Sequence, residues 1–110
     1  MEFNEAGLPL PGWDLDYWLG THFSLGVAPS VSPGSVPKFS TTHLFFRVME
    51  EVKSQGYFEF FQHTKLVVDW HNDIEHTLSA VRVRVPWQDT IEKTFAWGVC
   101  AALWKAEQDD

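Results

Sequence analysis

The sequence predicts an α+β fold in which packed helices lie on one small three-stranded antiparallel sheet, in the order ααβββα. Two helix-like apolar patterns occupy the first half of the chain, and a longer one closes it. Between them lie three short runs rich in aromatic and β-branched residues, joined by a few polar residues. Connections this short join antiparallel neighbours. The 110 residues form a single domain, 1–110, because a chain of this length supports one core.

The first helix is expected over residues 13–23. Apolar residues recur there at spacings of three and four, and Gly20 lies where such a helix could stop. Asp14 and Asp16 could act as a pair on a substrate, or they could meet the positive end of the helix dipole. The second interpretation is favoured, because residues two positions apart point to different sides of a helix.

Residues 26–37 form the next segment, which contains three Pro, three Ser and two Gly. This composition predicts an extended connection. The segment also carries apolar residues at Val27, Val31 and Val36. We therefore expect it to lie against the fold and not to separate two domains.

The αβββα unit, residues 39–106, is expected to begin with a helix. Ser40 is a suitable N-cap, and Phe39 before it can pack on Leu44 as a hydrophobic staple. One buried stripe then follows at helical spacing, made of Phe45, Val48, Met49 and Val52. Gly56 is expected just after the helix in the left-handed conformation that favours glycine.

Three strands are expected next, at residues 57–62, 65–71 and 76–85. In the third run valines alternate with Arg82 and Arg84, so the valines share one face and the arginines the other. Pro86 ends this strand. Across the sheet the two arginines could pair with Asp69 or Glu59.

The last helix is expected to open at Asp89, with Glu92 three positions later in capping-box register. Its main apolar stripe contains Ile91, Phe95, Val99 and Ala102. Small side chains at Gly98, Ala101 and Ala102 would let this helix approach the sheet or a neighbouring element closely.

A second apolar line on the same helix contains Trp97, Cys100 and Trp104. A helix that is apolar on two sides must bury both or present one of them to a partner. Two alternatives follow: the N-terminal helix covers this line, or the line makes an intermolecular contact.

Charge and composition restrict the classes of function. Eight Lys and Arg stand against fifteen Asp and Glu, a net charge of −7. This balance disfavours nucleic acid and anionic membranes as partners, and it favours either a basic protein partner or solubility alone. The single cysteine, Cys100, fits a reducing compartment. The sequence has neither a signal-peptide pattern at its start nor an apolar run that could span a bilayer, so we expect a soluble, cytoplasmic protein.

The strongest candidate for a metal site is the polar stretch between the second and third strands. Its imidazole and carboxylate side chains are those of Asp69, His71, Asp73, Glu75 and His76. The spacing matches no closed zinc module, and the polar tip of a hairpin explains the same residues. A metal-dependent enzyme that uses His71 and His76 therefore ranks third among the functional hypotheses.

Other catalytic chemistry is disfavoured. Cys100 lies in an apolar helix, where a thiol is normally buried, protonated and inert. The sequence contains no glycine-rich phosphate loop, and no spacing selects a pair of carboxylates for hydrolysis. We expect no catalytic residues, no cofactor and no metal.

The order helix, three strands, helix is also that of double-stranded-RNA-binding domains. Such domains need Lys and Arg to contact phosphates, and their closing helix begins with basic residues. This chain has Asp89 and Glu92 there. We therefore expect no direct binding of nucleic acid.

Three motifs resemble small phage and prophage proteins of the phage ABA-sandwich, or NinX-like, group. The first is the early Leu-Asp segment that ends in glycine, Leu15–Gly20. A Pro-rich stretch then runs into Phe39-Ser40-Thr41, and the last motif is Ala96–Leu103, with the form Ala-x-x-x-Cys-Ala-Ala-Leu. The resemblance implies a small α/β fold and a phage origin, and it carries no catalytic residues to transfer.

The leading hypothesis is a non-enzymatic phage accessory protein that binds a host protein in the host cytoplasm. An inhibitor of host defence fits an acidic product, for example one directed at a CRISPR–Cas complex, whose nucleic-acid channel is basic. The candidate binding residues are the acids Glu50, Glu51, Glu107, Asp109 and Asp110, with Trp97 and Trp104 as apolar anchors. The alternative is a self-associating structural or housekeeping phage protein, a homodimer through the last helix.

Overall fold

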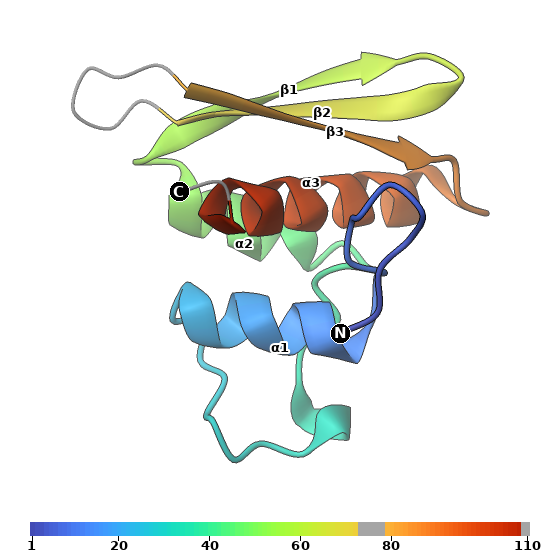
Figure 1. The fold of residues 1–110 in the computed structure, drawn as a ribbon. Helices are drawn as coiled ribbons and strands as arrows, with labels where there is room; N and C mark the ends of the chain where they lie inside the picture. Colours follow the sequence, from blue (N-terminus) through green and yellow to red (C-terminus); the bar gives the residue numbers. More distant parts are fainter. Residues whose placement is uncertain (73–78, 109–110) are drawn as a thin grey trace.

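The computed structural model describes residues 1–72 and 79–108, and its elements follow the predicted order (Figure 1). The elements are α1 (Trp13–His22), the 3-10 turn η1 (Pro33–Ser35), α2 (Phe45–Val52), β1 (Gly56–Gln62), β2 (Lys65–Asn72), β3 (Ser79–Pro86) and α3 (Ile91–Gln108). The α+β fold with the order ααβββα is confirmed. The predicted start of the third strand, residues 76–78, lies outside the described residues.

The sheet has the strand order β1-β2-β3, and both pairs of neighbours are antiparallel. Its inner face packs on α3 and carries the buried side chains Leu66, Val68, Trp70, Val83 and Val85. Behind the sheet, α2 and α3 form a second layer and α1 lies beyond them (Figure 1). All three helices therefore lie on one side, and within the described residues no helix covers the outer face of the sheet (Figure 1).

Helix α3 is the central element of the core. Its backbone approaches β2 so closely that a Cβ atom at Gly98 would lie 2.6 Å from Cγ2 of Val68. Every residue from Ala96 to Leu103 is buried. The expectation that small residues allow a close approach of this helix to the sheet is confirmed.

The N-terminal segment covers the second apolar line of α3. The indole Nε1 of Trp97 donates a hydrogen bond of 2.8 Å to the carbonyl oxygen of Pro9. The ring of Trp104 lies 5.3 Å from that of Phe3, centroid to centroid, and α1 also contacts α3. Trp97 and Cys100 are only 4% and 0% exposed. For these two residues, the second apolar line is therefore covered within the chain.

The three helices run in the same direction. His43, just before α2, lies 3.9 Å from Glu92 in the first turn of α3. At the other end, His22 closes α1 and its Nε2 lies 3.3 Å from Oε2 of Glu107 near the end of α3. The C-terminal ends of the helices are therefore at the same end of the helical layers.

The start of α2 differs from the prediction. The helix begins at Phe45, with Leu44 as its cap residue, so Ser40 is not its N-cap. Ser40 is instead fully buried and binds Asp16 of α1, whose Oδ1 accepts hydrogen bonds from the Ser40 backbone N–H at 2.7 Å and hydroxyl at 2.6 Å. The same hydroxyl oxygen accepts a 2.9 Å bond from the N–H of Gly12. Ser40 therefore binds a carboxylate that is distant in the sequence and does not cap the helix that follows it.

Both early acids lie in the first turn of α1, as the dipole interpretation requires, and Asp16 in addition has a partner outside the helix. Asp14 is exposed in the first turn of α1, and its carboxylate also lies 3.6 Å from the N-terminal amine of Met1. Asp16 is buried, and burial raises its pKa above the ordinary value of 3.8, although both Ser40 hydrogen bonds oppose this. Asp16 therefore ties α1 to the segment that precedes α2.

Two further local predictions are corrected. Gly56 does not adopt the left-handed conformation: it is the first residue of β1, where a Cβ would collide with the carbonyl oxygen of His71. At the start of α3, Thr90 accepts a 3.1 Å hydrogen bond from the N–H of Lys93 and is the cap, one residue later than Asp89. Asp89 instead pairs with the Lys93 ammonium at 3.1 Å.

Gly98→Ala tests the close packing of α3 on the sheet. Alanine favours a helix over glycine by about 1 kcal/mol, whereas overpacking a core costs about 1–3 kcal/mol. We expect the clash with Val68 to exceed the gain, so that urea unfolding shows a net loss of stability. Gly34→Ala is the control, since nothing lies within 4 Å of a Cβ there. A Gly98→Ala protein as stable as the wild type would contradict this packing.

Asp16→Asn and Asp16→Ala separate the hydrogen bonds of Asp16 from its charge. Alanine leaves the Ser40 donors buried without an acceptor and should cost about 1–3 kcal/mol. Asparagine retains an acceptor oxygen without a buried charge and should be at least as stable as wild type at neutral pH. Because the folded pKa is raised, ionisation of Asp16 costs the wild type stability as pH rises from 3.8 through the folded pKa. Unfolding curves against pH should show that Asp16→Asn lacks this loss; a loss as large as in the wild type would refute it.

Candidate functional site

The acidic candidates that the structure describes lie at one end of the helical layers, which we call the acidic end. Glu50 and Glu51 are in the last turn of α2, and Glu107 is in the last turn of α3. Because these helices run in the same direction, their negative dipole ends lie at the same end of the layers as these carboxylates. The other two acidic candidates, Asp109 and Asp110, lie outside the described residues.

The carboxylates of the acidic end differ in their partners. Glu50 forms an ion pair with Lys53, and Glu107 pairs with His22. Glu51 is exposed and makes no ion pair with any residue in the described ranges. All three side chains are accessible, and exposed pairs of this kind contribute little to stability. They can therefore exchange their partners at small cost.

The two tryptophan candidates are not equally accessible. Trp97 is buried beneath the N-terminal segment, and its indole N–H donates a hydrogen bond to the carbonyl oxygen of Pro9. Trp104 is partly buried against the ring of Phe3, which is itself exposed. Only Trp104 remains near the surface as an anchor.

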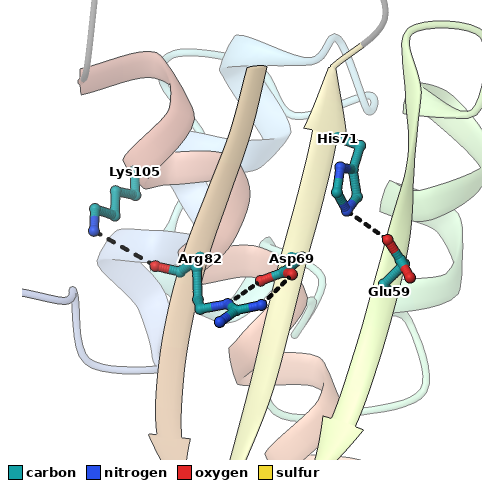
Figure 2. Close-up of polar contacts among 5 residues, drawn as sticks. All are labelled: Glu59, Asp69, His71, Arg82 and Lys105. Carbon is teal, nitrogen blue, oxygen red and sulfur yellow. Dashed lines mark hydrogen bonds and ion pairs between the residues drawn. The ribbon is translucent and has the colours of Figure 1, made fainter. Parts of the chain in front are cut away.

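The outer face of the sheet carries a network of polar side chains (Figure 2). The guanidinium of Arg82 donates two hydrogen bonds to Asp69, from Nε to Oδ1 at 2.7 Å and from Nη2 to Oδ2 at 2.8 Å. These bonds hold the pKa of Asp69 below its ordinary value of 3.8. The predicted pairing of Arg82 with Asp69 is confirmed. Glu59 pairs instead with His71, whose Nε2 lies 2.7 Å from Oε1 of Glu59 (Figure 2).

The proposed metal ligands are only partly within the described residues. Asp73, Glu75 and His76 lie outside them. Among the residues that the structure describes, no cluster of three His, Cys, Asp or Glu side chains could hold a metal ion. His71 stacks on the ring of Tyr57 at 4.7 Å in addition to its contact with Glu59.

The thiol of Cys100 is fully buried, as expected. Burial, and to a smaller extent the negative charge of Asp16, raises the pKa of this thiol well above 9.0. A protonated thiol without access to solvent does not act as a nucleophile.

A hollow of about 310 Å³ on the outer sheet face was not predicted from the sequence. We call it the basic hollow, and its walls are formed by Phe61, His63, Thr64, Lys65, Val67, Arg82 and Arg84. The signal for it was present, because the alternation of β3 places both arginines outward. The two-residue turn between β1 and β2 places Lys65 beside them. The predicted pairing with a cross-strand carboxylate is found for Arg82, whereas Arg84 forms no ion pair in the part of the chain that the structure describes.

Within the described ranges, no helix combines the length and apolarity needed to cross a bilayer. Comparisons with protein-family models, with characterised proteins and with solved structures gave no match for this chain. The chemistry of its surface is therefore the basis for a functional proposal.

Arg82→Met tests the pair on the outer face. Methionine keeps the apolar stem of the side chain and leaves the Asp69 carboxylate, 8% exposed, without its partner. Because the pKa of Asp69 is lowered in the folded state, the ion pair stabilises the protein above pH 3.8. This stabilisation is lost as the pH falls through the lowered pKa. We expect Arg82→Met to lower the unfolding midpoint at neutral pH and to have little effect at about pH 2. An equal effect at both pH values would contradict the assignment; Asp69→Asn with Arg82→Met should recover much of the loss.

Proposed function

We propose that this protein is a non-enzymatic phage accessory protein that binds a basic host protein through its acidic end. The observation that carries the proposal is the gathering of Glu50, Glu51 and Glu107 at the C-terminal ends of helices that run in the same direction. Side-chain charge and helix dipoles have the same sign there. Such a surface resembles a short row of phosphates in its charge.

The partner that fits this surface is a host protein that handles nucleic acid, such as a CRISPR–Cas complex with a basic channel. Carboxylates placed in that channel would occupy sites that otherwise bind phosphates, and the host activity would be inhibited. Complementary charge of this kind accelerates association, and salt weakens it. The overall charge of −7 also disfavours competing contacts with nucleic acid itself.

The self-associating alternative receives less support from the accessible surface. It requires the line of Trp97, Cys100 and Trp104, and the first two of these side chains are buried within the chain. A dimer through this line would have to displace the N-terminal segment and its hydrogen bond from Trp97 to Pro9. Among the described residues, no contact favours the metal-dependent enzyme.

The proposal is tested by removing charge from the acidic end. The tagged protein is used to capture partners from a host lysate at low and high salt, and the retained proteins are identified by mass spectrometry. We expect a basic nucleic-acid-handling protein that is released as salt rises. With that partner purified, the combination Glu50→Gln, Glu51→Gln and Glu107→Gln should weaken binding roughly tenfold or more.

The matched control is Glu2→Gln, Glu5→Gln and Glu92→Gln, which removes the same charge from exposed positions elsewhere. It should bind nearly as the wild type does. If both triple variants weakened binding equally, the effect would be due to net charge alone. That result would contradict a specific role of the acidic end. Recovery of the protein alone, as a dimer insensitive to salt, would favour the self-associating alternative.

A further inference from the structure

The basic hollow reverses the charge of the protein locally. The chain has eight Lys and Arg in total, and three of them, Lys65, Arg82 and Arg84, line this one hollow. Arg82 is neutralised by its two hydrogen bonds to Asp69. Lys65 and Arg84 are exposed, and neither forms an ion pair with a residue in the described parts of the chain. Two cations are thus left available on an acidic protein.

The strand register places these two cations close together. Arg84 lies opposite Val67 on β2, and Lys65 is two residues before Val67 on the same face. Diagonal neighbours of this kind are about 7–8 Å apart at their Cα atoms, within reach of one ligand for two long side chains. A single anionic group can therefore contact both.

The remainder of the hollow is apolar and aromatic. Val67 is buried at its base, and the ring of Phe61 is 37% exposed beside it. The guanidinium of Arg82 lies 5.7 Å from the centre of that ring. An exposed aromatic ring next to cations can stack a flat group whose charged end is held by those cations.

The turn that borders the hollow is held by the rest of the fold. The N–H of His63 donates a 3.1 Å hydrogen bond to the carbonyl oxygen of Lys65. The carbonyl oxygen of His63 accepts a 2.9 Å bond from Nε1 of Trp87, which follows β3. Thr64, between these residues, also lines the hollow. A fixed turn lowers the entropic cost of binding a small ligand.

We propose that the basic hollow binds a small phosphate monoester that carries a flat ring, a ligand of the mononucleotide class. Lys65 and Arg84 hold the phosphate, since an arginine fork and a lysine ammonium are the usual partners of a phosphate dianion. The flat ring lies against the exposed part of Phe61, beside the guanidinium of Arg82. The assignment goes beyond the proposed function, because it adds a ligand of the opposite charge at a different place.

The charges around the hollow favour a small anion over a polynucleotide. The next row of the outer face contains the carboxylates of Glu59 and Asp69, directly beside the row of Phe61, Val67 and Arg84. A long phosphate chain that crossed the sheet would meet these acids, whereas a single phosphate would not. The remaining acids are screened, because the Debye length is about 8 Å at physiological ionic strength.

The hollow and the acidic end lie at opposite ends of the molecule. The turn between β1 and β2 is at one end of the sheet, and the C-terminal ends of α2 and α3 are at the other (Figure 1). Substitutions at one place should leave the other intact, so the two proposals can fail separately.

The experiment is a titration of the whole ¹⁵N-labelled protein with adenosine monophosphate, inorganic phosphate and adenosine, followed by backbone amide shifts. We expect saturable shifts centred on Phe61, Lys65, Val67 and Arg84. Adenosine monophosphate should bind roughly tenfold more tightly than inorganic phosphate, because only the nucleotide gains the stacking contact. Adenosine alone should bind most weakly.

Variants separate the two parts of the site. Lys65→Gln with Arg84→Gln should weaken binding of adenosine monophosphate roughly tenfold or more, because both charged hydrogen bonds are lost. Phe61→Leu should reduce the nucleotide to the affinity of inorganic phosphate. The control is Lys53→Gln with Lys93→Gln, which removes the same charge from lysines that pair with Glu50 and Asp89. It should bind as the wild type does.

Three results would overturn the assignment. One is the lack of saturable shifts at the hollow up to about 10 mM ligand, a weaker interaction than a specific site provides. Another is an equal loss of affinity in the control variant. The third is an oligonucleotide that binds more tightly than the mononucleotide and gains affinity with length, since this would make the face a polynucleotide surface.

Discussion

The close contact between α3 and the sheet is the constraint on which the other elements depend. Because Gly98 has no side chain, α3 lies directly against Val68. The helical turn that follows Gly98 is buried on all sides. A helix buried all round needs other elements on the side away from the sheet. The N-terminal segment and α1 supply them, through the bond from Trp97 to Pro9 and the contact of Trp104 with Phe3. A larger residue at position 98 would move α3 outward and loosen both layers.

The buried carboxylate of Asp16 is the polar counterpart of that apolar contact. It fixes α1 to Ser40, more than twenty residues later in the sequence. The hydroxyl oxygen of Ser40 in turn accepts a hydrogen bond from the N–H of Gly12, the residue just before α1. Burial of the carboxylate carries a cost, which is the reason that its pKa is raised. The two hydrogen bonds fix the position of α1. Apolar packing alone allows a helix to slide or rotate, whereas two directional bonds to one oxygen do not. The loop between α1 and α2 is therefore closed by a polar contact on a core that is otherwise apolar.

The parts of this fold that depend on local pattern could be predicted from the sequence, and those that depend on distant partners could not. The strands and α3 follow from alternation and helical spacing, since each residue's environment there is set by its near neighbours. Ser40 has an ideal capping side chain, but its partner is Asp16, and no local rule identifies a buried acid on another helix. The basic hollow was missed for a similar reason. Lys65 and Arg84 become neighbours only through the register of β2 and β3, in which Val67 lies opposite Arg84, and the predicted strand ends 71 and 76 would have given a different register.

The opposite placement of the acidic end and the basic hollow follows from the strand count. Each of α2 and α3 returns along the strand adjacent to it in sequence, α2 before β1 and α3 after β3. With three antiparallel strands between them, β1 and β3 point the same way, so both helices must also share one direction (Figure 1). Their C-terminal ends then lie where β1 begins, and the turn between β1 and β2 lies at the far end. Acids in the last turns of the helices and cations beside that turn are thereby held apart without any direct contact. With two strands or four, the helices would run in opposite directions, and the same sequence motifs would place the acids of α2 and α3 at opposite ends.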